Sequence, residues 1–221
     1  MRDVIRPIIA IEGGIGAGKS TLARWLRAHT DALVTDEATS ALLPAYYADP
    51  ARWGFAVQVD TLTQRARALR SAHTLSSLTP TWLDRSVIGD RAFARANHAT
   101  QRLSASEYTL YRDLYDAIIT YDVELPHAVI YLEVSDDVLA ERRKRRSRSG
   151  EAVPRDYEDA LKRAYEDELR DYESRGGLVY RLDWSDDLRD SAPMYAAMTE
   201  FVLPIFDEVD TLLSSDEVSE N

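Results

Sequence analysis

A glycine-rich segment near the start of the chain has the residue types that hold phosphate groups. Residues 13–20 read Gly-Gly-Ile-Gly-Ala-Gly-Lys-Ser and fit the pattern G-x-x-x-x-G-K-[ST] at every position. Glycines let backbone N–H groups surround phosphate oxygens without Cβ clashes. In this pattern Lys19 reaches the outer phosphates of a nucleotide, and the Ser20 hydroxyl ligates Mg²⁺. The segment predicts an ATP site formed by Gly13, Gly14, Ile15, Gly16, Ala17, Gly18, Lys19, Ser20 and Thr21.

The surroundings of this phosphate loop match what such a site needs. The apolar run Ile8–Ile11 predicts a buried strand before it, and residues 20–29 predict a helix after it. The helix would aim the positive end of its dipole at a bound anion. A glycine-rich turn that matches by chance is the alternative, and the strand–loop–helix setting argues against it. The loop alone does not separate kinases, ATPases and GTPases, although the sequence has no N-K-x-D guanine signature.

Polar residues that could contact a substrate occur on one predicted helix and after one predicted strand. Gln58 and Arg65 are seven residues apart in the helix predicted over 52–75, so they lie on nearly the same side of it. Asp84 and Arg85 follow a strand predicted over 81–83. Because ligands bind beyond the carboxyl ends of parallel strands, this pair should face the phosphate loop. Surface exposure is the alternative for Gln58, and a structural salt bridge is the alternative for Asp84 and Arg85.

A dense basic cluster occurs in an otherwise acidic chain. Six of the eight residues from 141 to 148 are basic: Arg142, Arg143, Lys144, Arg145, Arg146 and Arg148. Guanidinium groups bind phosphate oxygens in pairs, and Arg142 and Arg146 share one helix face. A solvated helix face is the alternative. A segment that closed over ATP with these arginines would exclude water from the reaction.

Four of these motifs, in the same order, resemble those of the deoxynucleoside kinase family. Residues 12–21 (EGGIGAGKST) are similar to the family's E-G-N-I-G-x-G-K-S-T, and residues 47–58 (YADPARWGFAVQ) to its Y-x-x-P-x-R-W-x-F-x-x-Q. Residues 84–86 look like its E/D-R-S, and residues 142–151 look like its arginine lid, with Arg142, Arg146, Arg148 and Glu151 at the matching positions. The turn at 182–188 also resembles the family's. The resemblance implies transfer of the ATP γ-phosphate to the 5′-hydroxyl of a deoxynucleoside.

The resemblance also implies catalytic roles. A glutamate after the second strand acts as the base in the family, usually followed by proline, and here Glu37 has that place. Ala38 replaces the proline and Asp36 is adjacent, so both carboxylates remain candidates, with Glu37 favoured. Arg85 would neutralise the transferring phosphoryl group and position the base. Asp84 would hold Mg²⁺ together with Ser20.

Substrate contacts follow from the same resemblance. Tyr47 and Glu151 would both bind the 3′-hydroxyl of the sugar, while Gln58 would bind the base. Arg65 and Asp90 would face each other beside Gln58 and offer charge-assisted hydrogen bonds. This pair suits a purine, deoxyadenosine or deoxyguanosine, then deoxycytidine, with thymidine poor. An unrelated surface pair is the alternative. The implied substrate-binding set is Glu37, Tyr47, Gln58, Arg65, Arg85, Asp90 and Glu151.

The elements needed to position these residues alternate along the chain. Further strands are predicted over 32–34, 129–132 and 178–182, and helices over 104–121, 136–147, 157–172 and 193–213, the last one bent or broken at Pro204. The fold should be α/β: a P-loop kinase fold with a five-stranded parallel sheet, helices on both faces and an arginine-rich lid at about 141–154. One domain should span residues 1–213, followed by a flexible acidic tail at 214–221.

Composition narrows the remaining possibilities. The net charge of −11 argues against a nucleic-acid polymer as partner. The chain has no Cys, and its four His residues show no metal-ligand spacing. No apolar stretch is long enough for a membrane span, so a cytoplasmic protein is expected. The family resemblance implies a homodimer. A thymidylate-type nucleoside monophosphate kinase and a non-catalytic nucleotide-binding module remain as alternatives.

Overall fold

The computed structural model describes residues 5–121, 123–146, 153–186 and 191–219. These residues form one five-stranded sheet in the order β2-β3-β1-β4-β5, and every pairing between neighbouring strands is parallel. The predicted α/β fold with a five-stranded parallel sheet is therefore confirmed. The strands are β1 (Ile8–Gly13), β2 (Leu33–Val34), β3 (Thr81–Asp84), β4 (Ala128–Glu133) and β5 (Leu178–Asp183).

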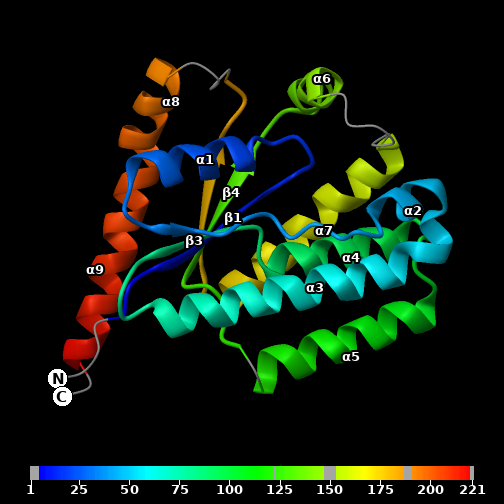
Figure 1. The fold of residues 1–221 in the computed structure, drawn as a ribbon, viewed down its shortest axis with the longest axis horizontal. Coiled ribbons are helices and arrows are strands. Elements are labelled where there is room, and N and C mark those ends of the chain that lie inside the picture. The colour runs from blue at the N-terminus through cyan, green and yellow to red at the C-terminus, as the bar shows by residue number, and fades with distance from the viewer. Residues whose placement is uncertain (1–4, 122, 147–152, 187–190, 220–221) are drawn as a thin grey trace.

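Helices cover both faces of the sheet (Figure 1). One face carries α1 (Lys19–His29), α8 (Ser191–Ala197) and α9 (Leu203–Ser219), and the other carries α3 (Pro50–Leu75), α4 (Val87–Ala99), α5 (Ala105–Tyr121) and α7 (Arg155–Ser174). The short helix α2 (Leu43–Ala48) leads into α3, and α6 (Asp136–Arg146) follows β4. None of the helices in the described residues is long and apolar enough to cross a bilayer.

The central strand β1 explains why the sequence signal for it is a continuous apolar run. Ile8 and Ala10 pack toward α3, α4 and α7, whereas Ile9 and Ile11 pack toward α1 and α9. All four are fully buried. A strand buried on both faces has no polar side to alternate with, so its apolar residues are consecutive.

Capping residues set the starts of two helices that hold the site. Asp49 accepts a hydrogen bond from the backbone N–H of Arg52 at 3.1 Å, and Pro50 takes the first helical position. Helix α3 therefore begins two residues before the predicted residue 52. At α5 a capping box is present, because Ser104 N donates to Glu107 at 2.8 Å and Glu107 N donates to Ser104 at 3.3 Å.

Helix α4 is not predicted by our reading of the sequence. Its residues are buried on nearly every side, including Gly89 and Asp90, so no amphipathic stripe marks it. The available signal is its N-cap, where Ser86 accepts from Ile88 N at 3.1 Å.

The C-terminal helical region differs from the prediction in two ways. Five residues of π-helix, η1 (Met198–Val202), replace a simple bend and end just before Pro204. Proline has no N–H to donate to the carbonyl four residues earlier, which favours a locally widened helix. Helix α9 then continues through Ser219, so residues 214–219 are helical where a flexible tail is predicted.

Candidate active site

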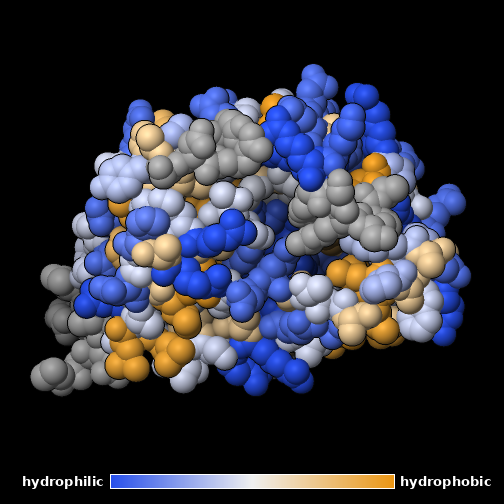
Figure 2. All heavy atoms as spheres, turned by 45° about the horizontal axis from the view of Figure 1, so that its top comes forward, coloured by the Kyte–Doolittle hydropathy of each residue, from blue (hydrophilic) through white to orange (hydrophobic). Residues whose placement is uncertain are grey.

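A cavity of about 750 Å³, here called the cleft, opens at the carboxyl ends of the central strands. Its lining comes from the segments that directly follow β1, β2 and β3, and from α2, α3, α4, α6 and α7. Hydrophilic side chains border most of the hollow in Figure 2. This is the edge of a parallel sheet at which ligands are expected to bind.

The phosphate loop forms one wall of the cleft. Gly13, Gly16 and Gly18 have φ angles of +145°, +93° and +103°, in the region that favours glycine. A Cβ at Gly13 would lie 3.0 Å from the carbonyl oxygen of Leu132, so the loop also passes too close to β4 for a larger residue. Helix α1 begins at Lys19, within the last residues of the loop motif and one residue before the predicted start at residue 20.

Lys19 is buried beneath this loop. Its Nζ donates to the carbonyl oxygens of Gly13 at 3.0 Å and Gly14 at 2.9 Å. Burial, followed by repulsion from Arg85, lowers the pKa of Lys19 to about 7. Phosphate oxygens bound nearby would therefore stabilise the protonated, charged form of Lys19.

Arg85 lies at the centre of the polar contacts. Its φ of +71° is unusual for a residue with a side chain. Its Nη1 donates to Gly13 O at 3.1 Å and to Tyr165 Oη at 2.7 Å, and the guanidinium carbon lies 4.7 Å from the ring centre of Phe93. Although burial opposes the charge, Tyr165 and Glu37 raise the pKa of Arg85, so the guanidinium stays charged.

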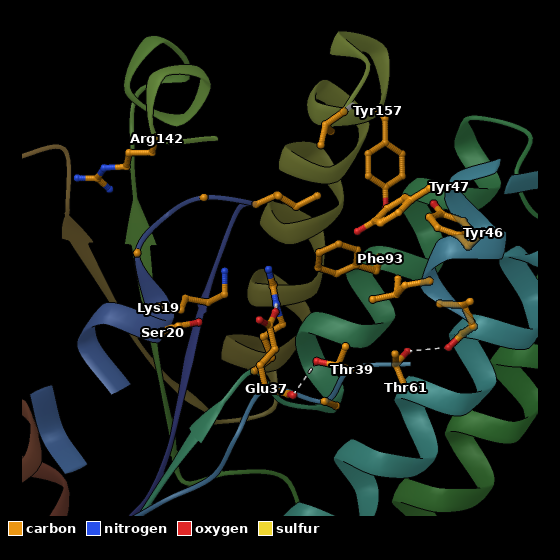
Figure 3. Close-up of a pocket in the computed structure, with 18 of the residues that line it drawn as sticks. Lys19, Ser20, Glu37, Thr39, Tyr46, Tyr47, Thr61, Phe93, Arg142 and Tyr157 are labelled. Atoms are coloured by element: carbon orange, nitrogen blue, oxygen red, sulfur yellow. Dashed lines mark hydrogen bonds and ion pairs between the residues drawn. The ribbon is translucent and has the colours of Figure 1, made fainter. Parts of the chain in front are cut away.

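Glu37, rather than Asp36, lines the cleft. Its Oε1 accepts from Arg85 Nε at 2.9 Å, and Figure 3 shows its side chain close to Lys19 and Ser20. Burial alone would raise the pKa of Glu37, but Arg85 and Lys19 lower it to about 2. Asp36 instead pairs with Arg27 at 2.9 Å and is 94% exposed.

A fully buried carboxylate, Glu12, supports this arrangement and is missing from the predicted site. Its Oε1 accepts from Ser86 N at 2.7 Å, from Ser86 Oγ at 2.8 Å and from Gly89 N at 3.2 Å. Its Oε2 accepts from Tyr165 Oη at 2.9 Å, and Tyr165 in turn accepts from Arg85. The signal in the sequence is a charged residue that ends an otherwise apolar strand.

Asp84 and Ser20 offer oxygens that fit a divalent cation. Asp84 is 4% exposed and hydrogen-bonds to Ser20, while its Oδ1 has no hydrogen-bond partner among the described residues. Burial, followed by the charge of Glu37, raises the pKa of Asp84. A hard cation prefers such oxygens, and Mg²⁺ bound to a nucleotide needs only one or two protein ligands. No group of three or more His, Cys, Asp or Glu suited to a metal occurs in the described residues.

The far end of the cleft holds a buried polar cluster on α3, α4 and α5. Arg65 forms an ion pair with Asp90, and Tyr111 Oη donates to Asp90 Oδ2 at 2.7 Å. Gln58 Nε2 donates to Asp90 Oδ2 and to the Asp90 carbonyl, both at 2.9 Å. Asp90 is fully buried, and Arg65 and Gln58 line the cleft, so this cluster can present donors and acceptors to a flat polar ligand.

Residues 9–203 match the sequence model of the family described as deoxynucleoside kinase. The chain belongs to the deoxynucleoside kinase family. This is a family of ATP-dependent phosphotransferases, and the match decides against a thymidylate-type monophosphate kinase.

Named relatives agree with this family. Deoxyguanosine kinase of Dictyostelium discoideum is 29% identical over 184 residues, which are 81% of this chain and 64% of that protein. Deoxyadenosine kinase of Lactobacillus acidophilus is 30% identical over 176 residues, covering 75% of this chain and 78% of that one. The solved structure of deoxyadenosine kinase from M. mycoides with bound dATP has a TM-score of 0.73 and 26% identity, covering 87% of this chain and 98% of that chain.

Of the arginines predicted to bind ATP, Arg142 has a side chain within the described residues. Arg142 lines the cleft and donates to the carbonyl oxygens of Ala17 at 2.9 Å and Trp184 at 2.8 Å. Arg146 ends α6, and its side chain lies outside the described residues, as do Arg148 and Glu151. Arg143, which is not a predicted ligand, pairs with Glu158 of α7.

Aromatic side chains form the wall opposite the phosphate loop. The predicted residue Tyr47 lies there, next to Tyr46, Phe93 and Tyr157 in Figure 3. The last three are missing from the predicted site. They come from three separate helices, so no local spacing in the sequence brings them together.

Proposed function

We propose that this kinase transfers the γ-phosphate of ATP to the 5′-hydroxyl of a purine deoxynucleoside, deoxyadenosine or deoxyguanosine, with deoxycytidine next and thymidine poor. The observation that carries this preference is the buried ion pair of Arg65 and Asp90 beside Gln58. In this proposal the pair would occupy the space that a 5-methyl group needs and would offer charged hydrogen-bonding groups to an amino or carbonyl substituent. Relatives named deoxyguanosine kinase and deoxyadenosine kinase support the purine assignment.

The phosphate loop and its neighbours would position the donor. Lys19 would contact the β and γ phosphates of ATP, aided by Arg142, Arg146 and Arg148 from the lid. Ser20 and Asp84 would hold Mg²⁺, which neutralises charge on the phosphate oxygens. The Oδ1 atom of Asp84 supports this assignment, because it is buried and has no hydrogen-bond partner among the described residues.

Glu37 and Arg85 would act on the acceptor. Glu37 would orient the 5′-hydroxyl and accept its proton as the new oxygen–phosphorus bond forms and ADP leaves. A carboxylate whose pKa is about 2 is a weak base. Phosphoryl transfer passes through a loose transition state that asks for little deprotonation in advance, so orientation is the larger part of this role. Arg85, charged throughout, would neutralise the phosphoryl group in transit.

Tyr47 and Glu151 would bind the 3′-hydroxyl of the sugar. Tyr47 lies on the aromatic wall of the cleft, and in this proposal its hydroxyl would contact the sugar. We also propose that the protein works as a homodimer in the cytoplasm, where ATP is available. Light scattering on the purified protein tests the dimer.

A competition among the four natural deoxynucleosides, with ATP and Mg²⁺, tests the substrate assignment. We expect a purine to have the highest kcat/KM and thymidine the lowest. Arg65→Met combined with Asp90→Ala should change this order. The double variant is preferred because Asp90→Ala alone leaves Arg65 as an unpaired buried charge, which costs about 3–5 kcal/mol. Thymidine as the best substrate, or an unchanged order in the folded double variant, would remove the pair from substrate selection.

A further inference from the structure

Five side chains form a continuous line of hydrogen bonds that ends at the base-binding end of the cleft. Arg102 Nη1 donates to Tyr46 Oη at 3.0 Å, and Tyr46 Oη donates to Asn97 Oδ1 at 2.7 Å. Asn97 Nδ2 donates to Gln58 Oε1 at 3.1 Å, and Gln58 Nε2 donates to Asp90 Oδ2 at 2.9 Å. These contacts join α2, α3 and α4 through residues far apart in the sequence.

The chemistry of the two ends gives the line one direction. Arginine can only donate hydrogen bonds, and an ionised aspartate can only accept them. The hydroxyl of Tyr46, which accepts from Arg102, must therefore give its proton to the Asn97 oxygen. The Asn97 amide nitrogen then faces Gln58. At the other end, both the carboxylate and the carbonyl of Asp90 require the nitrogen of Gln58.

Burial makes this direction costly to reverse. Gln58, Asn97 and Tyr46 are 3%, 4% and 8% exposed, and Asp90 is fully buried. A turned Gln58 amide would set its oxygen against two acceptors of Asp90 and its nitrogen against the nitrogen of Asn97. Buried polar groups without a partner are strongly unfavourable, so the Gln58 amide has a fixed polarity.

The outer end of the line is firmly held. The guanidinium of Arg102 lies 4.1 Å from the ring centre of Tyr157, and the Tyr157 hydroxyl hydrogen-bonds to Tyr46. Arg102, held against the Tyr157 ring, donates to Tyr46, and Tyr46 is left to donate to Asn97. All of these residues except Asp90 line the cleft, so the line runs along the wall that a base would face.

A fixed amide polarity matters because hydrogen-bond donors and acceptors are interchanged between the edges of the natural bases. Adenine has an amino donor beside a ring acceptor, whereas guanine has a carbonyl acceptor beside a ring N–H donor. Cytosine and thymine differ in the same way. If the sugar is held at the other end of the cleft, the base brings the same edge to Gln58 each time. The N–H groups of Gln58 are directed to Asp90, so the fixed amide offers its oxygen to the base. This oxygen accepts from an amino group and leaves a carbonyl group without a partner.

We propose that Asn97, held by Tyr46 and Arg102, is a positioning residue for base selection. It fixes the polarity of the Gln58 amide and so makes the kinase discriminate between 6-amino and 6-oxo purines. This inference rests on the proposed function, because it takes the buried cluster around Gln58 as the base site.

The main test is the ratio of kcat/KM for deoxyadenosine and deoxyguanosine in Asn97→Asp. The substitution keeps the shape of the side chain but removes the donor to Gln58. The wild type should prefer one purine by about tenfold or more, and the variant should lower that preference about tenfold. The KM for ATP should not change, because the phosphate loop is at the other end of the cleft. An equal loss for both purines, or an unchanged ratio, would overturn the proposal.

A second variant covers the case in which a buried carboxylate at position 97 prevents folding. Tyr46→Phe keeps the ring and removes only the hydroxyl that orients Asn97. It should lower the preference in the same direction by a smaller factor. Adding it to Asn97→Asp should produce no further change in the ratio, because both act on the same amide. Independent, multiplying effects would contradict the line of hydrogen bonds.

Tyr172→Phe is the matched control for Tyr46→Phe. The Tyr172 hydroxyl is also buried and donates to the carbonyl of Pro126, which precedes β4. Neither residue is among those that line the cleft. Its loss should affect stability and leave the purine ratio unchanged. A shift of the ratio in Tyr172→Phe as large as in Tyr46→Phe would show that general loosening causes it.

Binding measurements separate this inference from the proposed function. Dissociation constants of the four deoxynucleosides, measured by calorimetry, report the polarity of Gln58 without any turnover. Binding without phosphorylation would contradict the proposed function but still test Asn97. If only pyrimidines bind, the deoxycytidine-to-thymidine ratio replaces the purine ratio. A wild type with no preference within either pair would overturn the role of Asn97.

Discussion

Arg85 donates from Nε to Oε1 of Glu37 at 2.9 Å, and this contact joins the ends of two neighbouring strands across the cleft. The guanidinium holds the carboxylate ionised, because together with Lys19 it lowers the pKa of Glu37 to about 2. A carboxylate in this state is ionised at neutral and mildly acidic pH and is available there to a hydroxyl. The contact also keeps the Glu37 side chain in one orientation, which is what a substrate-orienting group needs.

Replacing Glu37 by glutamine should lower kcat much more than it weakens deoxynucleoside binding. Glu37→Gln keeps the size of the side chain but cannot accept a proton, so kcat should fall by about 10²–10⁴-fold. Steady-state kinetics with a saturating deoxynucleoside measures this. Asp36→Asn is the matched control, since Asp36 is 94% exposed and pairs with Arg27. Greater damage from Asp36→Asn than from Glu37→Gln would give the role to Asp36.

ATP binding should be accompanied by uptake of a proton at Lys19. With a pKa of about 7, a large part of the Lys19 population is neutral at pH 7.5. Phosphate oxygens favour the charged form, so binding should take up the larger part of one proton at that pH. Calorimetry of MgATP binding in two buffers with different ionisation enthalpies measures the uptake. The uptake should decrease toward pH 6, where Lys19 is already charged.

Lys19→Ala is the control for this measurement and a test in its own right. The variant should lose the proton uptake and about 10²-fold or more of the turnover while remaining folded. The lowered pKa of Lys19 also makes the stability of the folded protein depend on pH. Between pH 7 and 10.5 the unfolded chain binds more protons than the folded one at Lys19, so this residue makes the wild type more stable as pH rises. That contribution should disappear in the variant. Near-normal turnover would argue against phosphoryl transfer at this loop.

Removing the 3′-hydroxyl of the substrate should reduce its efficiency. A 2′,3′-dideoxynucleoside would leave Tyr47 without its partner, so kcat/KM should fall by about 10–100-fold relative to the 2′-deoxynucleoside. Tyr47→Phe should make this difference smaller, because the variant has already lost the hydrogen bond between Tyr47 and the 3′-hydroxyl. The KM for ATP serves as the internal control and should stay constant. Equal efficiency of the two sugars with the wild type would contradict the assignment of Tyr47.

A methyl group at Gly89 should disturb both the fold and the site. A Cβ there would lie 2.2 Å from Oε2 of Glu12, which is fully buried and held by three hydrogen-bonding neighbours. Gly89→Ala should cost about 1–3 kcal/mol of stability and lower kcat, since Glu12 supports Arg85 through Tyr165. Chemical unfolding and kinetics measure the two effects. Gly176→Ala is the control: its Cβ has open space and only its φ of +88° resists, so stability alone should change.

The sequence predicts those parts of the fold and site that rest on local patterns. The phosphate loop is recognisable because its glycines, Lys19 and Ser20 are consecutive and follow a strand buried on both faces. The start of α5 is recognisable because Ser104 and Glu107 satisfy each other three residues apart. In both cases the physics that makes the structure acts between near neighbours in the chain.

The parts that escape sequence analysis depend on distant neighbours. Helix α4 has no amphipathic stripe because other elements surround it, and its Asp90 is buried only because α3 supplies Arg65 and Gln58. Tyr46 and Asn97 are 51 residues apart, and no spacing rule connects them. The choice between Asp36 and Glu37 also needs the folded chain, which turns one to solvent and the other to the cleft.

The position of Trp184 gives the protein a built-in optical reporter. Of the four tryptophans in the chain, only Trp184 is among the described residues that line the cleft. A Cβ at Gly18 would lie 3.3 Å from its ring, and its carbonyl accepts from Arg142. Indole emission responds to nearby charge, so phosphates that enter the loop should alter its fluorescence. Nucleotide affinity could then be read in every inactive variant, by light alone and without following product formation.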